Sequence, residues 1–364
     1  MISLSGVQGT VSPEQVRAAA RERREKMKKA IACLLLALAL VAVLEPNVRG
    51  RIVDAVTSLL ASQEETAQAD AVPAFSQQLG GASRTDMLNV TLYFRFADTA
   101  VLGAQSAQLD IRREETIATS IVQRLLDGPD MYHEHLTSVF PQGTELISVR
   151  GDGTTAFVTL SSAFLGKPDG APADWEDLTI WQEEAALRRR LAVQSVALAL
   201  TEDGRYQRVQ LYVADSDDEI PQRIAMAWMD TGVTDPSLVL AACPRDEQVL
   251  LTPGRAVEMM MDAWQRQNWH EMYPLMADTQ ADPLPTLSVF ENEMALRGIA
   301  LLEYSVTPGT VSLDGQTATV VLDARIRSRE GGDAQIIRES VPLVRAQDNW
   351  AMENGTLRSL MIRD

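Results

Sequence analysis

The sequence predicts a protein with two α+β domains that follow an N-terminal transmembrane helix. Three observations lead to this prediction. The chain has 364 residues, enough for two domains of ordinary size. One uncharged apolar run, Ala30–Leu44, directly follows a basic segment. Beyond residue 86, helical and strand patterns are separated by turns rich in Gly, Asp and Pro, in an order typical of α+β folds.

The basic segment and the apolar run predict a signal anchor. Residues 1–29 hold seven Lys or Arg and three Glu, which indicates a cytoplasmic tail under the positive-inside rule. As a helix the apolar run spans about 22 Å, less than the roughly 30 Å of a hydrocarbon core. Two interpretations therefore remain: a cleaved secretory signal, or an uncleaved transmembrane helix over residues 30–48. We favour the second because no convincing cleavage site follows the run. A buried core helix is disfavoured because the run has no polar face.

This topology makes the protein a single-pass membrane protein with everything after residue 45 outside the cytoplasm. Residues 49–86 are predicted to be an amphipathic segment followed by a flexible linker rich in Ala, Gln and Ser. Cys33 then lies in or beside the bilayer and Cys243 outside it, so the two should not pair within one chain. We expect Cys243 to be a buried small hydrophobe, with pairing between chains as the alternative.

Charge and composition exclude several classes of function. The formal net charge is −17, and so acidic a protein would repel a nucleic-acid backbone. Two cysteines cannot build a disulfide framework, and three histidines leave little for a histidine-rich metal site. The sequence has no P-loop, no GxSxG, no CxxC and no GxGxxG in a supporting context, so no cofactor is predicted.

Residues 87–220 are predicted to form the first domain, with the order β-α-β-β-α-β and two helices covering one side of a sheet. The Gly151-Asp152-Gly153 turn indicates a hairpin, and Gly128-Pro129 ends the first helix. The predicted elements are strand Met87–Phe96, helix Glu114–Leu126, strands Glu145–Arg150 and Thr154–Leu160, helix Leu178–Leu200 and strand Arg208–Ala214.

Residues 221–251 are interpreted as a connector, and residues 252–364 as a second α+β domain. Thr252-Pro253 has the pattern of an N-cap and first helical residue, and Val257, Met260, Met261 and Trp264 share one face of the helix that follows. Two shorter helices, Trp269–Met276 and Thr286–Arg297, precede an antiparallel sheet of strands Ala300–Val306, Thr310–Leu313, Thr317–Arg327 and Gln335–Arg345.

Four segments of the first domain resemble the GerM (sporulation and germination) domain of bacterial cell-envelope proteins. They are Leu125–Pro129, Phe140–Leu146, the hairpin Gly151–Ser161 and the closing strand Val209–Val213. Their order and spacing carry the resemblance. It implies a tethered, ring-building module and not a catalyst, working in an envelope complex with other envelope or spore-assembly proteins or with itself.

The second domain resembles the nuclear-transport-factor-2-like or cystatin-like fold, which implies a cone made by a curved antiparallel sheet wrapped over helices. Folds of this shape sometimes hold an acid-base pocket. By position alone, the candidate acids are Asp262, Glu271, Asp278 and Glu291. The alternative function is therefore a small-molecule or peptide binder, or a weak hydrolase, that uses this cone.

Outside the resemblance, three groups of residues invite a functional interpretation. His133 and His135 could offer two imidazoles to a metal, but a polar surface loop is the better interpretation and no metal site is predicted. The Met259–Met261 run with Trp264 is better explained as core than as a ligand pocket. Arg188-Arg189-Arg190 is a basic spot in an acidic domain; it is either one turn of solvated helix or an interface for an acidic partner or a second copy.

Overall fold

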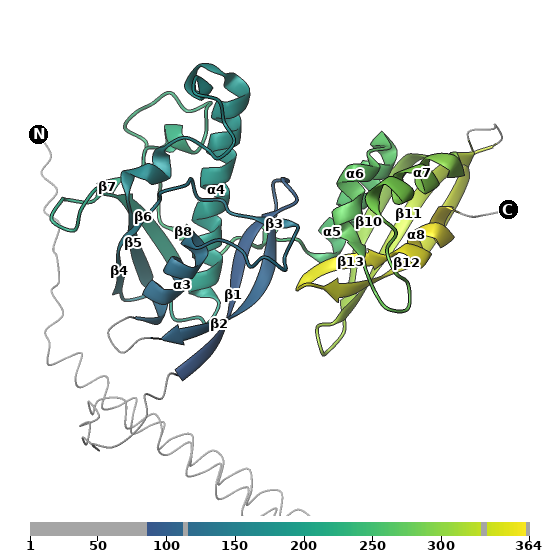
Figure 1. Ribbon diagram of the computed structural model, residues 1–364, viewed down its shortest axis with the longest axis horizontal. Helices are drawn as coiled ribbons and strands as arrows, with labels where there is room; N and C mark the ends of the chain where they lie inside the picture. The colour runs from purple at the N-terminus through teal and green to yellow at the C-terminus, as the bar shows by residue number, and fades with distance from the viewer. Residues whose placement is uncertain (1–85, 112–115, 329–332, 362–364) are drawn as a thin grey trace, which may run out of the picture. The chain divides into compact units, whose positions relative to one another are not determined.

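The computed structural model describes residues 86–111, 116–328 and 333–361 (Figure 1). The predicted cytoplasmic tail, the transmembrane helix over residues 30–48 and the linker that follows lie outside the described residues. Within the described ranges, no helix combines the length and apolarity that crossing a bilayer requires. The described residues form a mixed α+β structure with three sheets.

The N-terminal half contains two separate sheets instead of the single sheet expected. Strands β1 (Asp86–Phe96), β2 (Leu102–Ile111) and β3 (Leu136–Thr137) form one sheet in the order β2-β1-β3. The other consists of β4 (Leu146–Asp152), β5 (Thr155–Leu160), β6 (Arg208–Val213) and β7 (Gln222–Arg223), with β8 (Cys243–Pro244) also pairing with β6. The predicted order β-α-β-β-α-β is therefore incomplete, because it omits β2 and the short β3.

Two helices lie against these sheets. Helix α3 (Ile117–Leu126) starts after the N-cap Thr116, later than the predicted start at Glu114, and Glu114 lies outside the described residues. Helix α4 (Thr179–Thr201) confirms the predicted long helix; it packs on α3, on β1 of one sheet and on β6 of the other. The buried hydroxyl of Ser195 donates to the carbonyl of Tyr93 at 2.6 Å, which ties α4 to β1. Because α4 is covered on several sides, more than half of its residues are buried.

The predicted connector contributes to the second sheet. Residues 222–223 and 243–244 pair with β6 as β7 and β8, and Ile224 and Met229 between them are almost fully buried. A short 3-10 helix, Met226–Trp228, lies in this segment. Cys243 is a free, half-buried thiol in β8.

The C-terminal half follows the predicted order of helices first and sheet second. Thr252 caps α5 (Pro253–Arg266), and the expected face of Val257, Met260, Met261 and Trp264 is fully buried. Helices α6 (Trp269–Met272), α7 (Leu287–Arg297) and α8 (Asn354–Met361) accompany a sheet of β9 (Met276–Ala277), β10 (Ile299–Val311), β11 (Thr317–Ser328), β12 (Gln335–Ala346) and β13 (Asn349–Glu353) in the order β10-β11-β12-β13-β9.

Three details of this half differ from the sequence prediction. The two strands predicted at Ala300–Val306 and Thr310–Leu313 are one strand, β10, with irregular pairing between Thr307 and Thr310. Helix α6 is shorter than predicted and is followed by a 3-10 turn, Tyr273–Leu275. Strands β9 and β13 and helix α8 were not predicted. The likeness to the nuclear-transport-factor-2-like fold stays a prediction.

Candidate functional site

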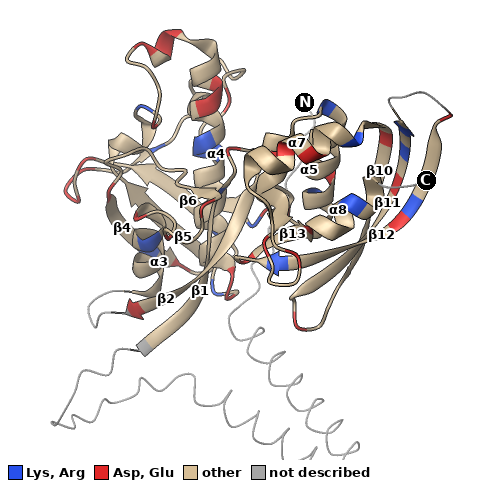
Figure 2. Cartoon of the chain, turned by 45° about the vertical axis from the view of Figure 1, so that its right-hand side comes forward, with Lys and Arg blue, Asp and Glu red and all other residues tan. Residues whose placement is uncertain are grey.

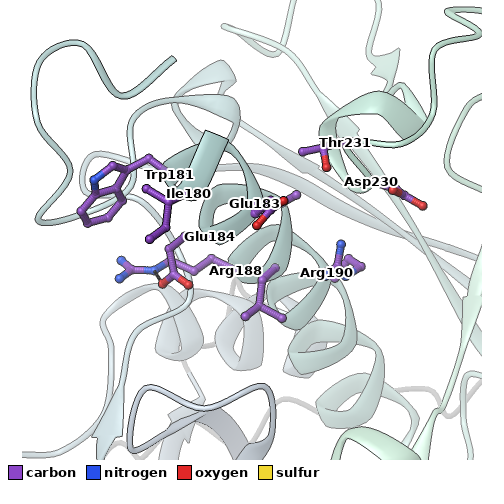
Figure 3. A pocket seen from close by; sticks show the side chains of 10 residues that line it. Ile180, Trp181, Glu183, Glu184, Arg188, Arg190, Asp230 and Thr231 are labelled. Atoms are coloured by element: carbon purple, nitrogen blue, oxygen red, sulfur yellow. Dashed lines mark hydrogen bonds and ion pairs between the residues drawn. The ribbon is translucent and has the colours of Figure 1, made fainter. Parts of the chain in front are cut away.

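An open groove runs along the N-terminal part of α4 and is the candidate site (Figure 3). It encloses about 750 Å³. One wall is α4 itself, and the other comes from the loop that carries Asp230 and Thr231. The lining residues are Ile180, Trp181, Glu183, Glu184, Ala186, Leu187, Arg188, Arg190, Asp230 and Thr231.

The loop before α4 folds over the helix around a small apolar cluster of its own. Trp175, in the 3-10 turn Trp175–Asp177, packs with Ala171 and with Ala185 of α4, and Trp181 lies against this cluster. The cluster packs the end of this loop against α4, while Phe164 near the start of the loop belongs to the main core. Sequence reasoning did not single out these aromatic residues, although Trp175 and Trp181 flank the helix start six residues apart.

Arg189 is the anchor of the groove. Only 4% of its surface is exposed, and its guanidinium carbon lies 4.9 Å from the Trp228 ring centroid and 5.7 Å from that of Trp175. Its Nη2 atom donates to the carbonyls of Leu165 at 2.7 Å and Gly166 at 3.1 Å. One side chain thus links α4 to both flanking loops through two cation–π contacts and hydrogen bonds to main-chain carbonyls.

Burial lowers the pKa of Arg189 to about 10, against a smaller opposing effect of the Glu176 charge. The guanidinium therefore stays charged at neutral pH. Arg189 offers no surface to a partner, so the predicted interface of three arginines is corrected to two residues. For Arg188 and Arg190, the interface stays a prediction.

The other two arginines point to opposite sides of the groove (Figure 3). Arg188 donates from Nε to Glu184 at 2.7 Å and from Nη1 to the carbonyl of Asp169 at 3.1 Å. Arg190 is exposed and donates to the carbonyl of Met229. Arg188 is therefore neutralised within the chain, whereas Arg190 forms no ion pair with any residue that the structure describes.

Glu184 lies between two arginines. It pairs with Arg188 and with Arg95 of β1, whose Nη1 and Nη2 atoms both contact its carboxylate. Burial would raise the pKa of Glu184, but hydrogen bonds and charges from Arg95 and Arg188 outweigh it and hold that pKa below its ordinary value. The ion pairs tie the groove wall to the first sheet and leave Glu184 unsuited to proton transfer.

The groove lining mixes apolar and charged side chains. As the described residues form it, the lining contains no Ser, Cys or His. It combines a 74%-exposed Ile180 and the half-buried Trp181 and Leu187 with charges of both signs. Aromatic and Arg side chains such as Trp181, Arg188 and Arg190 are enriched at protein–protein interfaces, whereas the acids Glu183, Glu184 and Asp230 are of a kind depleted there.

The histidines predicted as weak metal candidates do not form a metal cluster. The His135 ring lies edge-on against Phe96, with centroids 6.3 Å apart, and burial lowers its pKa despite the charge of Glu134. Among the described residues, no group of three or more His, Cys, Asp or Glu side chains is placed to hold a metal ion.

A known protein family matches the part of the chain that runs from β1 to β6 and includes α3 and α4. Residues 91–219 match the model of the Germane family, described as sporulation and spore germination. These residues form a GerM-type domain. The match covers about a third of the chain, includes the groove wall on α4, and confirms the resemblance expected from the sequence.

Solved structures give weaker similarities. The tandem GerMN domains of the sporulation protein GerM from Bacillus subtilis align with 15% identity and a TM-score of 0.29, over 48% of this chain and 50% of that one. The chain thus spans about half the length of that structure. The first GerMN domain of the same protein aligns with 19% identity and a TM-score of 0.24, over 35% and 84%.

A putative lipoprotein from Clostridium perfringens aligns with 14% identity and a TM-score of 0.22, over 37% of this chain and 82% of that one. A search of curated protein sequences gives no significant match. The GerM-type assignment therefore rests on the family match to residues 91–219.

The buried cation leads to a stability prediction. Arg189→Ala should lower the free energy of unfolding by about 2–4 kcal/mol, because several carbonyls lose their donor and two indoles lose their cation. Arg189→Lys should restore little of this stability, since an ammonium lacks the planar group with several N–H donors that a guanidinium offers. Urea denaturation followed by circular dichroism measures this. Arg190→Ala is the control, with an expected cost within about 1 kcal/mol; equal costs at both positions would contradict the anchoring role.

The Glu184 ion pairs predict a pH dependence. Because the folded pKa of Glu184 is lowered, its stabilisation is present above the unfolded value of about 4.3 and is lost as pH falls through the folded value. Glu184→Gln should cost about 2–4 kcal/mol at pH 7 and progressively less in acid. The measurement is urea denaturation at pH 7, 5 and 3. The exposed neighbour provides the control, Glu183→Gln; a Glu184→Gln penalty that stays constant from pH 7 to 3 would refute the assignment.

Proposed function

We propose that this chain is a membrane-anchored, extracytoplasmic scaffold protein of a bacterial envelope complex, related to sporulation or germination, that acts through protein–protein contacts. The observation that carries the proposal is the groove on α4, an open surface with exposed Ile180 on a helix of the GerM-type domain. Such domains are not known as enzymes. The basic tail and apolar run supply the proposed anchor.

The exposed apolar residues support binding over a purely structural role. Ile180 in the first turn of α4 is 74% exposed, and Leu178 at the N-cap of the helix is 37% exposed. Trp228, which stacks on Arg189, is 39% exposed. Large apolar side chains that are exposed to solvent are a feature of surfaces that another protein covers.

The C-terminal half gives the alternative function less support. Its interior is filled by fully buried side chains, among them Met260, Trp264 and Phe290. The four acids considered for an acid-base site are not buried: Asp262, Glu271 and Asp278 are exposed and Glu291 is half-buried. None of the four therefore has the buried setting in which an acid-base pocket holds its carboxyl groups.

Cross-linking from the groove tests the scaffold role. A photoreactive amino acid at position 180, in the full chain expressed in bacterial cells, should give adducts with protein in the membrane fraction. The control position is Asp203, which follows the other end of α4; the 23 residues of that helix separate the two sites by about 35 Å. Position 180 should give several-fold more adduct than position 203. Equal yields from both positions would refute the groove as the contact surface.

Protease accessibility tests the proposed topology. Proteinase K added to spheroplasts should degrade the part of the chain after residue 45, because the positive-inside rule places it outside the cytoplasm. A C-terminal tag detected on a blot reports the cleavage. A cytoplasmic protein of the host provides the intactness control. Survival of the tag until the membrane is opened by detergent would show that the topology is wrong.

A further inference from the structure

The outward face of α4 carries a regular stripe of four residues. Ile180, Glu183, Leu187 and Arg190 follow one another at spacings of three, four and three, which places them on one side of a helix. All four line the groove. Ile180, Glu183 and Arg190 are exposed, while Leu187 is half-buried and Ala186 beside it is buried. The stripe therefore has an apolar centre with a charge on either side.

The two charges of the stripe have no oppositely charged partner in the described part of the chain. Glu183 forms no ion pair there, and Arg190 contacts only the carbonyl of Met229. This differs from Glu184 and Arg188, which neutralise each other. Figure 2 shows the same order of charges along α4, with acidic residues toward its N-terminal end and the arginines after them.

This order is self-complementary when two copies of the helix run antiparallel. A two-fold axis between Ala186 and Leu187 places Glu183 level with Arg190 of the second copy, and Arg190 level with the second Glu183. Each charge lies about 5 Å along the helix from that axis. A single contact then forms two ion pairs, and the two half-buried Leu187 side chains meet at the centre.

We propose that a second copy of this chain occupies the groove, with the two α4 helices antiparallel about a two-fold axis at Ala186–Leu187. This inference rests on the proposed function, because it names the partner of the same groove. It also differs from a ring, in which each contact joins two different surfaces: a two-fold contact joins identical surfaces and is complete with two copies.

A disulfide between copies tests the arrangement. In the full chain with Cys33→Ser and Cys243→Ser, which removes both native cysteines, Leu187→Cys places one thiol beside the axis. Facing helices bring such residues close to the Cα separation of 4.4–6.8 Å that a disulfide needs. Mild oxidation of membranes should give a dimer on a non-reducing gel. Asp203→Cys is the matched control and should give several-fold less dimer.

Charge exchange separates this contact from chance collisions. Adding Glu183→Arg or Arg190→Glu to Leu187→Cys should lower the dimer yield about tenfold, because two attractive pairs become repulsive. Both changes together should restore it, since the exchanged charges again face each other. Glu183→Gln and Arg190→Gln should weaken the dimer less, and circular dichroism of each variant confirms folding.

Two results would overturn the proposal. One is a Leu187→Cys dimer no stronger than the Asp203→Cys control. The other is a yield that the single charge reversals leave unchanged or that the double exchange fails to restore. If position 180 cross-links to a different protein while Leu187→Cys gives no dimer, the scaffold role stands and the two-fold pairing fails. If position 180 gives no specific adduct at all, the proposed function fails with it.

Discussion

The surface around α4 depends on one buried positive charge. Placing a guanidinium in the protein interior is costly unless its donors and its charge are compensated. Among the described residues, no carboxylate forms an ion pair with Arg189; main-chain carbonyls and two indole rings compensate its charge instead, and its Nε atom is buried without a hydrogen-bond partner. Those partners come from the loops on either side of α4, so one side chain holds both loops. The groove walls, including the loop with Asp230, are a consequence of that fixed arrangement.

Glu183 and Glu184 are adjacent in the sequence and carry the same carboxyl group, but they have different roles in the fold. Glu184 points to the Arg95 side of α4 and ties the helix to β1. Glu183 is one residue earlier, about 100° around the helix; it faces the groove and forms no ion pair with the residues that the structure describes. The same division applies to the arginines, because consecutive helical residues cannot share a direction. Consecutive charged residues on one helix can therefore include both a residue that binds within the chain and a residue that faces outward.

Much of this could be predicted from the sequence, and the failures have physical reasons. The helices at α4 and α5 and the hairpin at Gly151–Gly153 follow from periodicity and turn residues, and they are confirmed. Strand β2 was missed because Gln105, Ser106 and Gln108 interrupt its apolar pattern. Strand β9 has only two residues, too few to show the alternation of apolar and polar side chains that indicates a strand. It is defined by its pairing with β13, a tertiary contact.

The groove was only partly predictable. The run Arg188-Arg189-Arg190 lies on the turn of α4 that borders the groove. The prediction that all three arginines form one interface does not hold for Arg189, which is buried. A stronger signal was available: Arg189 stands in register with Ala185, Ala192 and Val196, a stripe that faces the interior. The contribution of Trp228 could not be inferred, since it comes from a distant segment that the sequence presents as a connector.

The proposed anchor and the proposed self-contact depend on each other energetically. Ion pairs on an exposed surface contribute little each, so two pairs and one apolar centre make a weak contact in dilute solution. Tethering to a membrane changes this, because copies confined to one surface meet at a much higher effective concentration than free chains do. A weak, self-complementary stripe is then sufficient for pairing at the membrane and leaves detached chains separate. The modest size and mixed polarity of the groove are consistent with a contact that works only where the chain is held.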